Sequence, residues 1–319
     1  MSDLLRGIRD VARQRSQRRA APTAAPSPWT RPEVAPRAPG RPTRSSIARG
    51  APQIAEAPAP VDSVDELRGA SRIGRKGTNV VESERPLREL LPDVDVLADL
   101  ERDLNHLAGC DPEDVYLGLR PAIGRRAEEL AFVDLETCGF WGCPIFLVGI
   151  LLVEDGELVS RQILACDYPD EDEMLRISVR LLREREALVT FNGKSYDVPC
   201  FAERCAYFGV RTKIRRQAHV DVLHASRRRW KGEWEDCRLQ TLERRVTQLV
   251  RSGDIPSSEI PEVYHEFART QELGDLEAVL HHGRIDTITT ARLFAALAAD
   301  PPTPIRPRKK KRAATDEAA

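Results

Sequence analysis

The chain has 319 residues, enough for one or two domains, and its net charge of −1 does not by itself indicate a nucleic-acid partner. The charge is uneven, because the first sixty residues carry eleven arginines against four acids, and the run RPRKKKR covers 306–312. No signal peptide is visible, and the longest apolar run, 144–153, is too short to cross a membrane. We therefore expect a cytoplasmic protein with no membrane partner.

The first part of the chain has the composition of a disordered region. Residues 20–60 mix proline, alanine and arginine without an apolar period, so they cannot bury enough surface to offset the entropy lost on ordering. Residues 61–85 remain polar, and we predict disorder over 1–85. From residue 86, leucines at helical spacing predict a helical arm over 86–127, with a break at Pro92.

The pattern of a compact domain covers residues 128–297. One strand begins at Leu130, and two more follow around a hairpin turn at Asp155-Gly156. A helix, a short buried strand over 187–191 and a second helix follow, and the rest of the domain is mostly helical. A three-stranded meander followed by alternating helix and strand predicts a mixed α/β sheet flanked by helices. The last segment, 298–319, is predicted to be a basic disordered tail.

Two carboxylates, Asp134 and Glu136, end the apolar strand LAFVDLE. Acids are almost never buried unless they are paired or hold a metal, and residues two apart on a strand share one face. Asp197 ends the run FNGKSYD and taken alone reads as a helix cap, while Asp286 alone reads as a helix start. Together the four acids suit two hard divalent ions, Mg²⁺ or Mn²⁺, which would clamp a phosphodiester.

A histidine near these acids would orient or deprotonate the attacking water. His282 lies four residues before Asp286 and shares its helical face, and His281 is the competitor.

The order VDLET, FNGKSYD, HHGRID resembles the DEDD exonucleases of the ribonuclease-H-like superfamily. More narrowly, the chain resembles the YprB-type ribonuclease-H-like domain, through HVDVLHASRRRWKGEWEDCRLQTLE and GDIPSSEIPEVYHEFART as well as VLHHGRID. The resemblance covers about half of the chain. It implies a ribonuclease-H-like fold and a metal-dependent 3′–5′ exonuclease that acts on single-stranded 3′ ends of DNA or RNA. The implied ligands of the two ions are Asp134, Glu136, Asp197 and Asp286.

The family patterns leave the general base open. DEDD enzymes place a histidine five residues before the last aspartate or a tyrosine four before it, whereas the YprB-type pattern has histidine four before. The first spacing points to His281 and the second to His282, which is favoured. The chain also has Gly283 where the family has asparagine.

Several residues near the acids are candidates for nucleic-acid contact. Lys194 and Ser195 would contact the scissile phosphate, or they belong to a simple glycine-containing turn. The segment SRRRWKGEW, 226–234, would bind a single strand by stacking and charge, or it is a solvated basic face with its tryptophans packed inward. The full set of predicted contacts is Thr137, Asn192, Lys194, Ser195 and Tyr196.

Two other functions stay open. A non-enzymatic nucleic-acid-binding module would keep the fold with weak or lost catalysis. A zinc-stabilised interaction protein would need Cys138, Cys143, Cys200 and Cys205 to converge, although free buried thiols are the usual state of such residues.

Overall fold

One mixed sheet of seven strands forms the centre of the computed structural model, which describes residues 53–55, 61–112 and 115–299. The strands lie side by side in the order β1-β2-β5-β4-β3-β6-β7. β3 pairs antiparallel with β4 and parallel with β6, so it lies where the two kinds of pairing meet. The strands are β1 (Ala70–Ile73), β2 (Val80–Pro86), β3 (Leu130–Thr137), β4 (Ile145–Glu154), β5 (Glu157–Ala165), β6 (Ala187–Thr190) and β7 (Ala218–Asp221).

The predicted order of elements is confirmed over the domain. β3, β4 and β5 form the antiparallel meander, and a helix then leads to the parallel strand β6. Asp155 and Gly156 join β4 to β5 with φ angles of 48° and 81°, the positive values that a two-residue hairpin turn requires. The expected class, a mixed α/β sheet flanked by helices, is therefore correct.

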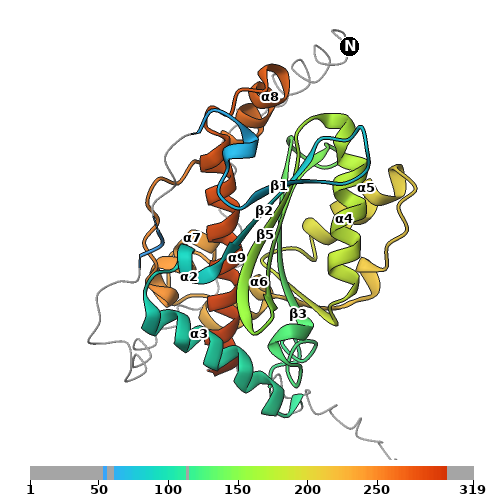
Figure 1. The fold of residues 1–319 in the computed structure, drawn as a ribbon. Helices are drawn as coiled ribbons and strands as arrows, with labels where there is room; N and C mark the ends of the chain where they lie inside the picture. The colour runs from blue at the N-terminus through green and yellow to red at the C-terminus, as the bar shows by residue number, and fades with distance from the viewer. Residues whose placement is uncertain (1–52, 56–60, 113–114, 300–319) are drawn as a thin grey trace, which may run out of the picture. The chain divides into compact units, whose positions relative to one another are not determined.

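Helices cover both faces of the sheet (Figure 1). α4 (Glu171–Arg183) and α5 (Asp197–Tyr207) lie on one face. α9 (Leu276–Ala299) crosses the other face, and α3 (Val94–His106), α6 (Val222–Trp230) and α8 (Ile260–Thr270) pack against it. The short elements are α2 (Leu87–Leu90), α7 (Leu239–Leu242), the π-helical turn η7 (Glu243–Thr247), and the 3₁₀ turns η1 (Val64–Glu66), η2 (Leu107–Gly109), η4 (Ala127–Glu129), η5 (Tyr168–Asp170) and η6 (Ile214–Arg216).

Side chains alternate along β3 as the strand period requires. Val133 and Leu135 pack into the core under α4 and α5, whereas Phe132 packs into the core under α9. Asp134 and Glu136 alternate with the first pair, so they lie on the α9 face. The prediction that the two acids share one face is confirmed.

Two glycines let α9 lie directly on the sheet. A Cβ atom at Gly283 would lie 3.2 Å from Nε2 of Gln162, and one at Gly149 would lie 3.8 Å from the Gly283 carbonyl oxygen. The Cβ position of Gly283 is also 4.0 Å from Oε1 of Glu136. This close approach brings the polar residues of α9 to the acids of β3.

Among the helices of the described residues, none combines the length and the apolar character needed to cross a membrane. α9 has 24 residues, but it carries charged side chains along its length.

The expectation of disorder is wrong for residues 61–85. β2 pairs along its whole length with β5 and continues the sheet past the meander. Its polar residues are buried with partners, since Arg284 donates to the Ser83 hydroxyl at 2.6 Å and Arg85 pairs with Glu89 at 3.5 Å. A strand whose buried positions are polar does not show the apolar alternation by which strands are recognised.

The helical arm breaks at Pro92 as predicted, but its last α-helix, α3, ends at His106 and does not continue to residue 127. α2 ends at Leu90, and α3 begins after Asp93, whose carboxylate accepts the backbone N–H of Val96. The predicted disorder of 1–52, 56–60 and 300–319 lies outside the described residues.

Candidate functional site

Asp134 and Glu136 are half-buried at the end of β3. Burial raises the pKa of Asp134 well above its ordinary value, and the neighbouring carboxylates of Glu136, Asp286 and Asp197 raise it further. Burial likewise raises the pKa of Glu136 to about 8, although His282 opposes the shift. The four predicted acids therefore lie close enough together to repel one another.

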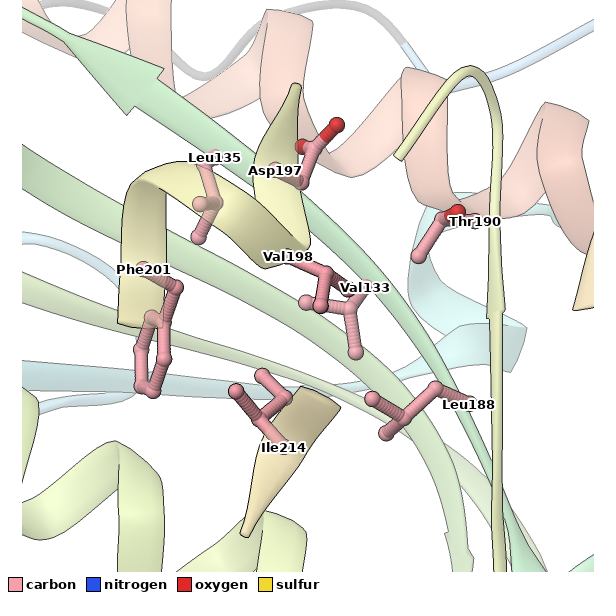
Figure 2. Close-up of a pocket in the computed structure, with 8 residues that line it drawn as sticks. All are labelled: Val133, Leu135, Leu188, Thr190, Asp197, Val198, Phe201 and Ile214. Atoms are coloured by element: carbon pink, nitrogen blue, oxygen red, sulfur yellow. The ribbon is translucent and has the colours of Figure 1, made fainter. Parts of the chain in front are cut away.

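Asp197 reaches this group from the other face of the sheet. It is the first residue of α5, with Tyr196 at the cap position, so the interpretation of Asp197 as a helix cap is wrong. Its carboxylate points away from the apolar side chains around it, which include Val133 and Phe201 (Figure 2). Burial raises its pKa to about 7, and Asp221 contributes to the shift. The apolar packing beneath Asp197 thus holds its carboxylate near Asp134, at the end of β3.

Asp286 lies in the middle of α9 and not at a helix start. Its Oδ1 atom is 2.5 Å from Arg251, and its Oδ2 atom is 3.5 Å from Nε2 of His282. Two cationic side chains therefore offset part of the negative charge of the site.

The two candidate histidines have different surroundings. Nδ1 of His282 is 2.7 Å from Asp254 Oδ1, which leaves Nε2 facing Asp286. Burial lowers the pKa of His282, but the hydrogen bond to Asp254 and the nearby acids outweigh burial and raise it to about 9. His281 instead hydrogen-bonds the Ser252 carbonyl oxygen through Nε2 at 3.0 Å, and burial lowers its pKa. Of the two, His282 is the one that contacts the acid group.

Arg251 connects the site to a buried network that the sequence did not reveal. Its guanidinium donates two hydrogen bonds of 2.8 Å to Glu243, one of 3.0 Å to Asp254 and one of 2.5 Å to Asp286. Only 9% of the Arg251 side chain and 2% of the Glu243 side chain are exposed. Asp254 belongs to the segment GDIPSSEIPEVY, which the family resemblance singled out without assigning a role to Asp254. No local pattern in the sequence marked Arg251 or Glu243 as residues of the site.

Asp221, at the end of β7, holds the turn that precedes Asp197. Its buried carboxylate accepts the backbone N–H groups of Asn192 at 3.0 Å and Lys194 at 3.1 Å. A Cβ atom at Gly193 would lie 2.3 Å from Thr190 Oγ1, so the turn needs glycine there. Sequence reasoning missed Asp221, although an acid directly after a buried strand is the signal that identified Asp134.

The predicted nucleic-acid contacts fall into two groups. The hydroxyls of Thr137 and Tyr196 lie 3.0 Å apart, and both contact the Gly139 carbonyl oxygen, which ties the loop after β3 to α5. Lys194 and Ser195 are exposed on the turn, as is Asn192. The first pair thus shapes the edge of the site, and the exposed group faces solvent beside it.

A cleft of about 520 Å³ opens at the acid group. Asp134 and Asp286 line it together with Arg227 of α6 and Arg238, which precedes α7. The lining residues are Asp134, Phe191, Asn192, Leu223, Arg227, Asp236, Cys237, Arg238, Leu239 and Asp286.

Comparison with known proteins identifies the family of this domain. A family model described as RNase_H superfamily matches residues 131–298. The chain belongs to the RNase H superfamily. It is also 32% identical over 177 residues to the uncharacterized protein YprB of Bacillus subtilis (strain 168), a match that covers 54% of this chain and 43% of the relative. The match thus spans less than half of that relative's length.

The RNase H-like domain contains the four acids, both histidines and the cleft. The predicted resemblance and fold are therefore confirmed. Domains of this superfamily commonly hydrolyse nucleic acids, so the fold is of the nuclease type and suggests nucleic-acid binding. Fold alone does not define the reaction, which depends on the residues of the site.

The acids of this RNase H-like domain fit divalent ions by their chemistry. Carboxylate oxygens are the ligands that Mg²⁺ and Mn²⁺ prefer, and a bound cation would replace the protons that the raised pKa values of Glu136 and Asp197 retain near neutral pH. In the part of the chain that the structure describes, no three His, Cys, Asp or Glu side chains already converge on one point as metal ligands do. This holds equally for Cys138, Cys143 and the other cysteines of the zinc interpretation, all of which are free thiols.

Proposed function

We propose that the chain is a metal-dependent nuclease, a 3′–5′ exonuclease that hydrolyses phosphodiester bonds of DNA or RNA. One observation carries the proposal: four mutually repelling carboxylates from β3, α5 and α9 lie together in a domain of the RNase H superfamily, and two of them, Asp134 and Asp286, line an open cleft. A buried group of like charges costs free energy. A bound divalent cation would offset that cost and would also clamp the phosphodiester of the substrate.

Asp134, Glu136, Asp197 and Asp286 would hold two Mg²⁺ or Mn²⁺ ions. When bound, the ions would promote ionisation of the attacking water and neutralise the leaving oxygen. Glu136 and Asp197, whose pKa values lie near neutrality, would give up their protons on loading.

His282 is the proposed general base. Asp254 holds its Nδ1 atom at 2.7 Å, so the proton from water would be accepted at Nε2, on the side of Asp286. Neutralisation of the acids by bound cations would lower the pKa of His282, because the raised value depends partly on Asp286 and Glu136. His281 is engaged with the Ser252 carbonyl oxygen and is not assigned to the reaction.

Degradation of oligonucleotides tests the proposal. Single-stranded DNA and RNA labelled at the 5′ end are incubated with Mn²⁺ or Mg²⁺, and the wild type is compared with Asp134→Asn and Asp197→Asn. We expect stepwise shortening from the 3′ end by the wild type and loss of this activity in both variants. Asp65→Asn, at an exposed acid far from β3 in the sequence, is the matched control and should keep the activity.

The outcomes separate the possible functions. Cleavage of circular substrates would indicate an endonuclease in place of an exonuclease. Absence of metal-dependent cleavage by folded wild type, with binding retained, would refute the enzyme and support the nucleic-acid-binding module. Circular dichroism of each variant checks that the fold is intact.

A further inference from the structure

The cleft beside the acids also contains cationic side chains. Asp134 and Asp286 lie in its lining, and Arg227 of α6 and Arg238, which precedes α7, lie in the same lining. Acids alone would repel a polyanion, so the arginines provide the charge that a phosphate backbone needs. The volume of about 520 Å³ falls within the range of ligand pockets.

The arginines of the cleft are accessible, whereas neither tryptophan of the segment 226–234 lines the cleft. Arg227 is exposed, and the Arg238 side chain is 86% exposed, with a contact of 3.4 Å to Asp236. Trp230 is only 7% exposed and packs on Trp234, with ring centroids 5.7 Å apart. The inward-packed interpretation is therefore correct for Trp230, while Trp234 is half-buried.

Phe191 is the aromatic residue of the cleft. Part of its surface packs against the core under α9, and the half-buried ring also lines the cleft. Leu223 and Leu239 line the same space and add apolar surface. Unpaired bases stack on aromatic rings whatever their sequence, because each base has a π face.

One buried carboxylate fixes both walls of this cleft. Asp221 accepts the N–H of Asn192, next to Phe191, and also the N–H of Leu223 in the first turn of α6, at 3.1 Å. Its side chain is fully buried. The spacing of the walls is therefore set before any ligand enters, which lowers the ordering cost of binding.

We propose that this cleft is the binding site for single-stranded nucleic acid, with Arg227 and Arg238 bound to backbone phosphates and Phe191 stacked on a base. The guanidinium forks donate paired hydrogen bonds to phosphate oxygens. The inference rests on the proposed function and names the substrate site next to its acids.

A thiol in the cleft permits a test that does not depend on catalysis. Cys237 lines the cleft and is half-buried, while Cys110, of similar exposure, lies outside the lining. The full chain is treated with a maleimide in EDTA, with and without single-stranded DNA or RNA oligonucleotides, and labelling of each cysteine is followed by peptide mass spectrometry. We expect the oligonucleotide to slow labelling of Cys237 about tenfold and to leave Cys110 unchanged.

Variants then test the residues of the site. Arg227→Ala and Arg238→Ala should each shift the oligonucleotide concentration needed for protection of Cys237 by about tenfold and reduce the salt dependence by about one charge. Arg228→Ala removes the same charge from the neighbouring exposed position of α6, outside the lining, and should leave protection unchanged. Phe191→Leu should weaken protection without changing its salt dependence.

Three results would overturn the inference. The first is an equal rate of Cys237 labelling with and without saturating oligonucleotide. The second is that Arg227→Ala and Arg238→Ala behave like Arg228→Ala. The third is that duplex DNA protects Cys237 as well as a single strand does. EDTA prevents metal-dependent cleavage, so the labelling assay measures binding apart from catalysis. Protection of Cys237 in EDTA, combined with no cleavage by the wild type in the separate assay with Mn²⁺ or Mg²⁺, would support the binding site while refuting the nuclease. Cleavage with Mn²⁺ or Mg²⁺ without protection of Cys237 would support the nuclease and refute the binding site.

Discussion

Replacement of Arg251 by methionine should lower the free energy of unfolding by about 3–5 kcal/mol. Methionine keeps an unbranched apolar stem but removes the guanidinium, which donates to Glu243, Asp254 and Asp286. Asp254 and Asp286 would retain His282 as a partner. Most of the loss therefore comes from Glu243, the most buried of the three acids.

The size of the effect follows from the burial of that pair. The Glu243 side chain is 2% exposed, and its two hydrogen bonds of 2.8 Å to Arg251 leave Thr289 as its other side-chain partner. Removal of one member of a buried ion pair leaves an uncompensated charge, which costs far more than the net value of the pair. Natural domains are stable by about 5–15 kcal/mol, so this loss would be a large fraction of the total.

Urea denaturation in EDTA, followed by circular dichroism, measures the change. Arg251→Met combined with Glu243→Gln should be more stable than Arg251→Met alone, because the second change removes the stranded charge. Arg269→Met is the matched control, since Arg269 pairs with Glu266 on the surface with 69% and 60% of the side chains exposed, and its midpoint should not move. A wild-type midpoint for Arg251→Met, or a double variant weaker than the single, would refute the reasoning.

Three further predictions concern the acids, the helix crossing and the base. In EDTA the wild type should lose stability relative to Glu136→Gln as pH rises from about 4.5 to about 8. The reason is that the folded protein retains a proton on Glu136, whereas the unfolded chain releases it at the ordinary pKa of 4.5. Thermal midpoints of the two proteins that diverge in the opposite direction would contradict this prediction. Asp197, whose pKa is raised to about 7, should show the same sign with Asp197→Asn in the window from about 3.8 to 7. Gly283→Asn, which introduces the side chain of the family pattern, should destabilise the fold by about 1–3 kcal/mol, measured by urea denaturation, because it would press on buried neighbours where α9 meets the sheet. Asp254→Asn should lower kcat about 100-fold with KM nearly unchanged, because His282 loses the partner that orients it, and an equal change in KM would point to a substrate contact instead.

The acids of the site were visible in the sequence because they break a strong local pattern. Asp134 and Glu136 end an apolar strand, and the strand period alone predicts that they share a face. Asp221 carries the same signal and could have been found by it. β2 was missed for the opposite reason, since its buried Ser83 and Arg85 have polar partners that only the folded chain supplies.

The sequence by itself determined the α/β class, the order of the elements and the acids of the candidate site, because strand and helix periods and misplaced charges are local properties. Only the tertiary structure showed that His282, and not the adjacent His281, contacts the acid group, because the two residues differ in what packs against each. It alone also revealed Arg251 with Glu243, and it placed Arg227 of the basic segment 226–234 and Arg238 in one cleft. Ion pairs and clefts join residues distant along the chain, and their energy depends on burial, which exists only once the helices and the sheet have packed together.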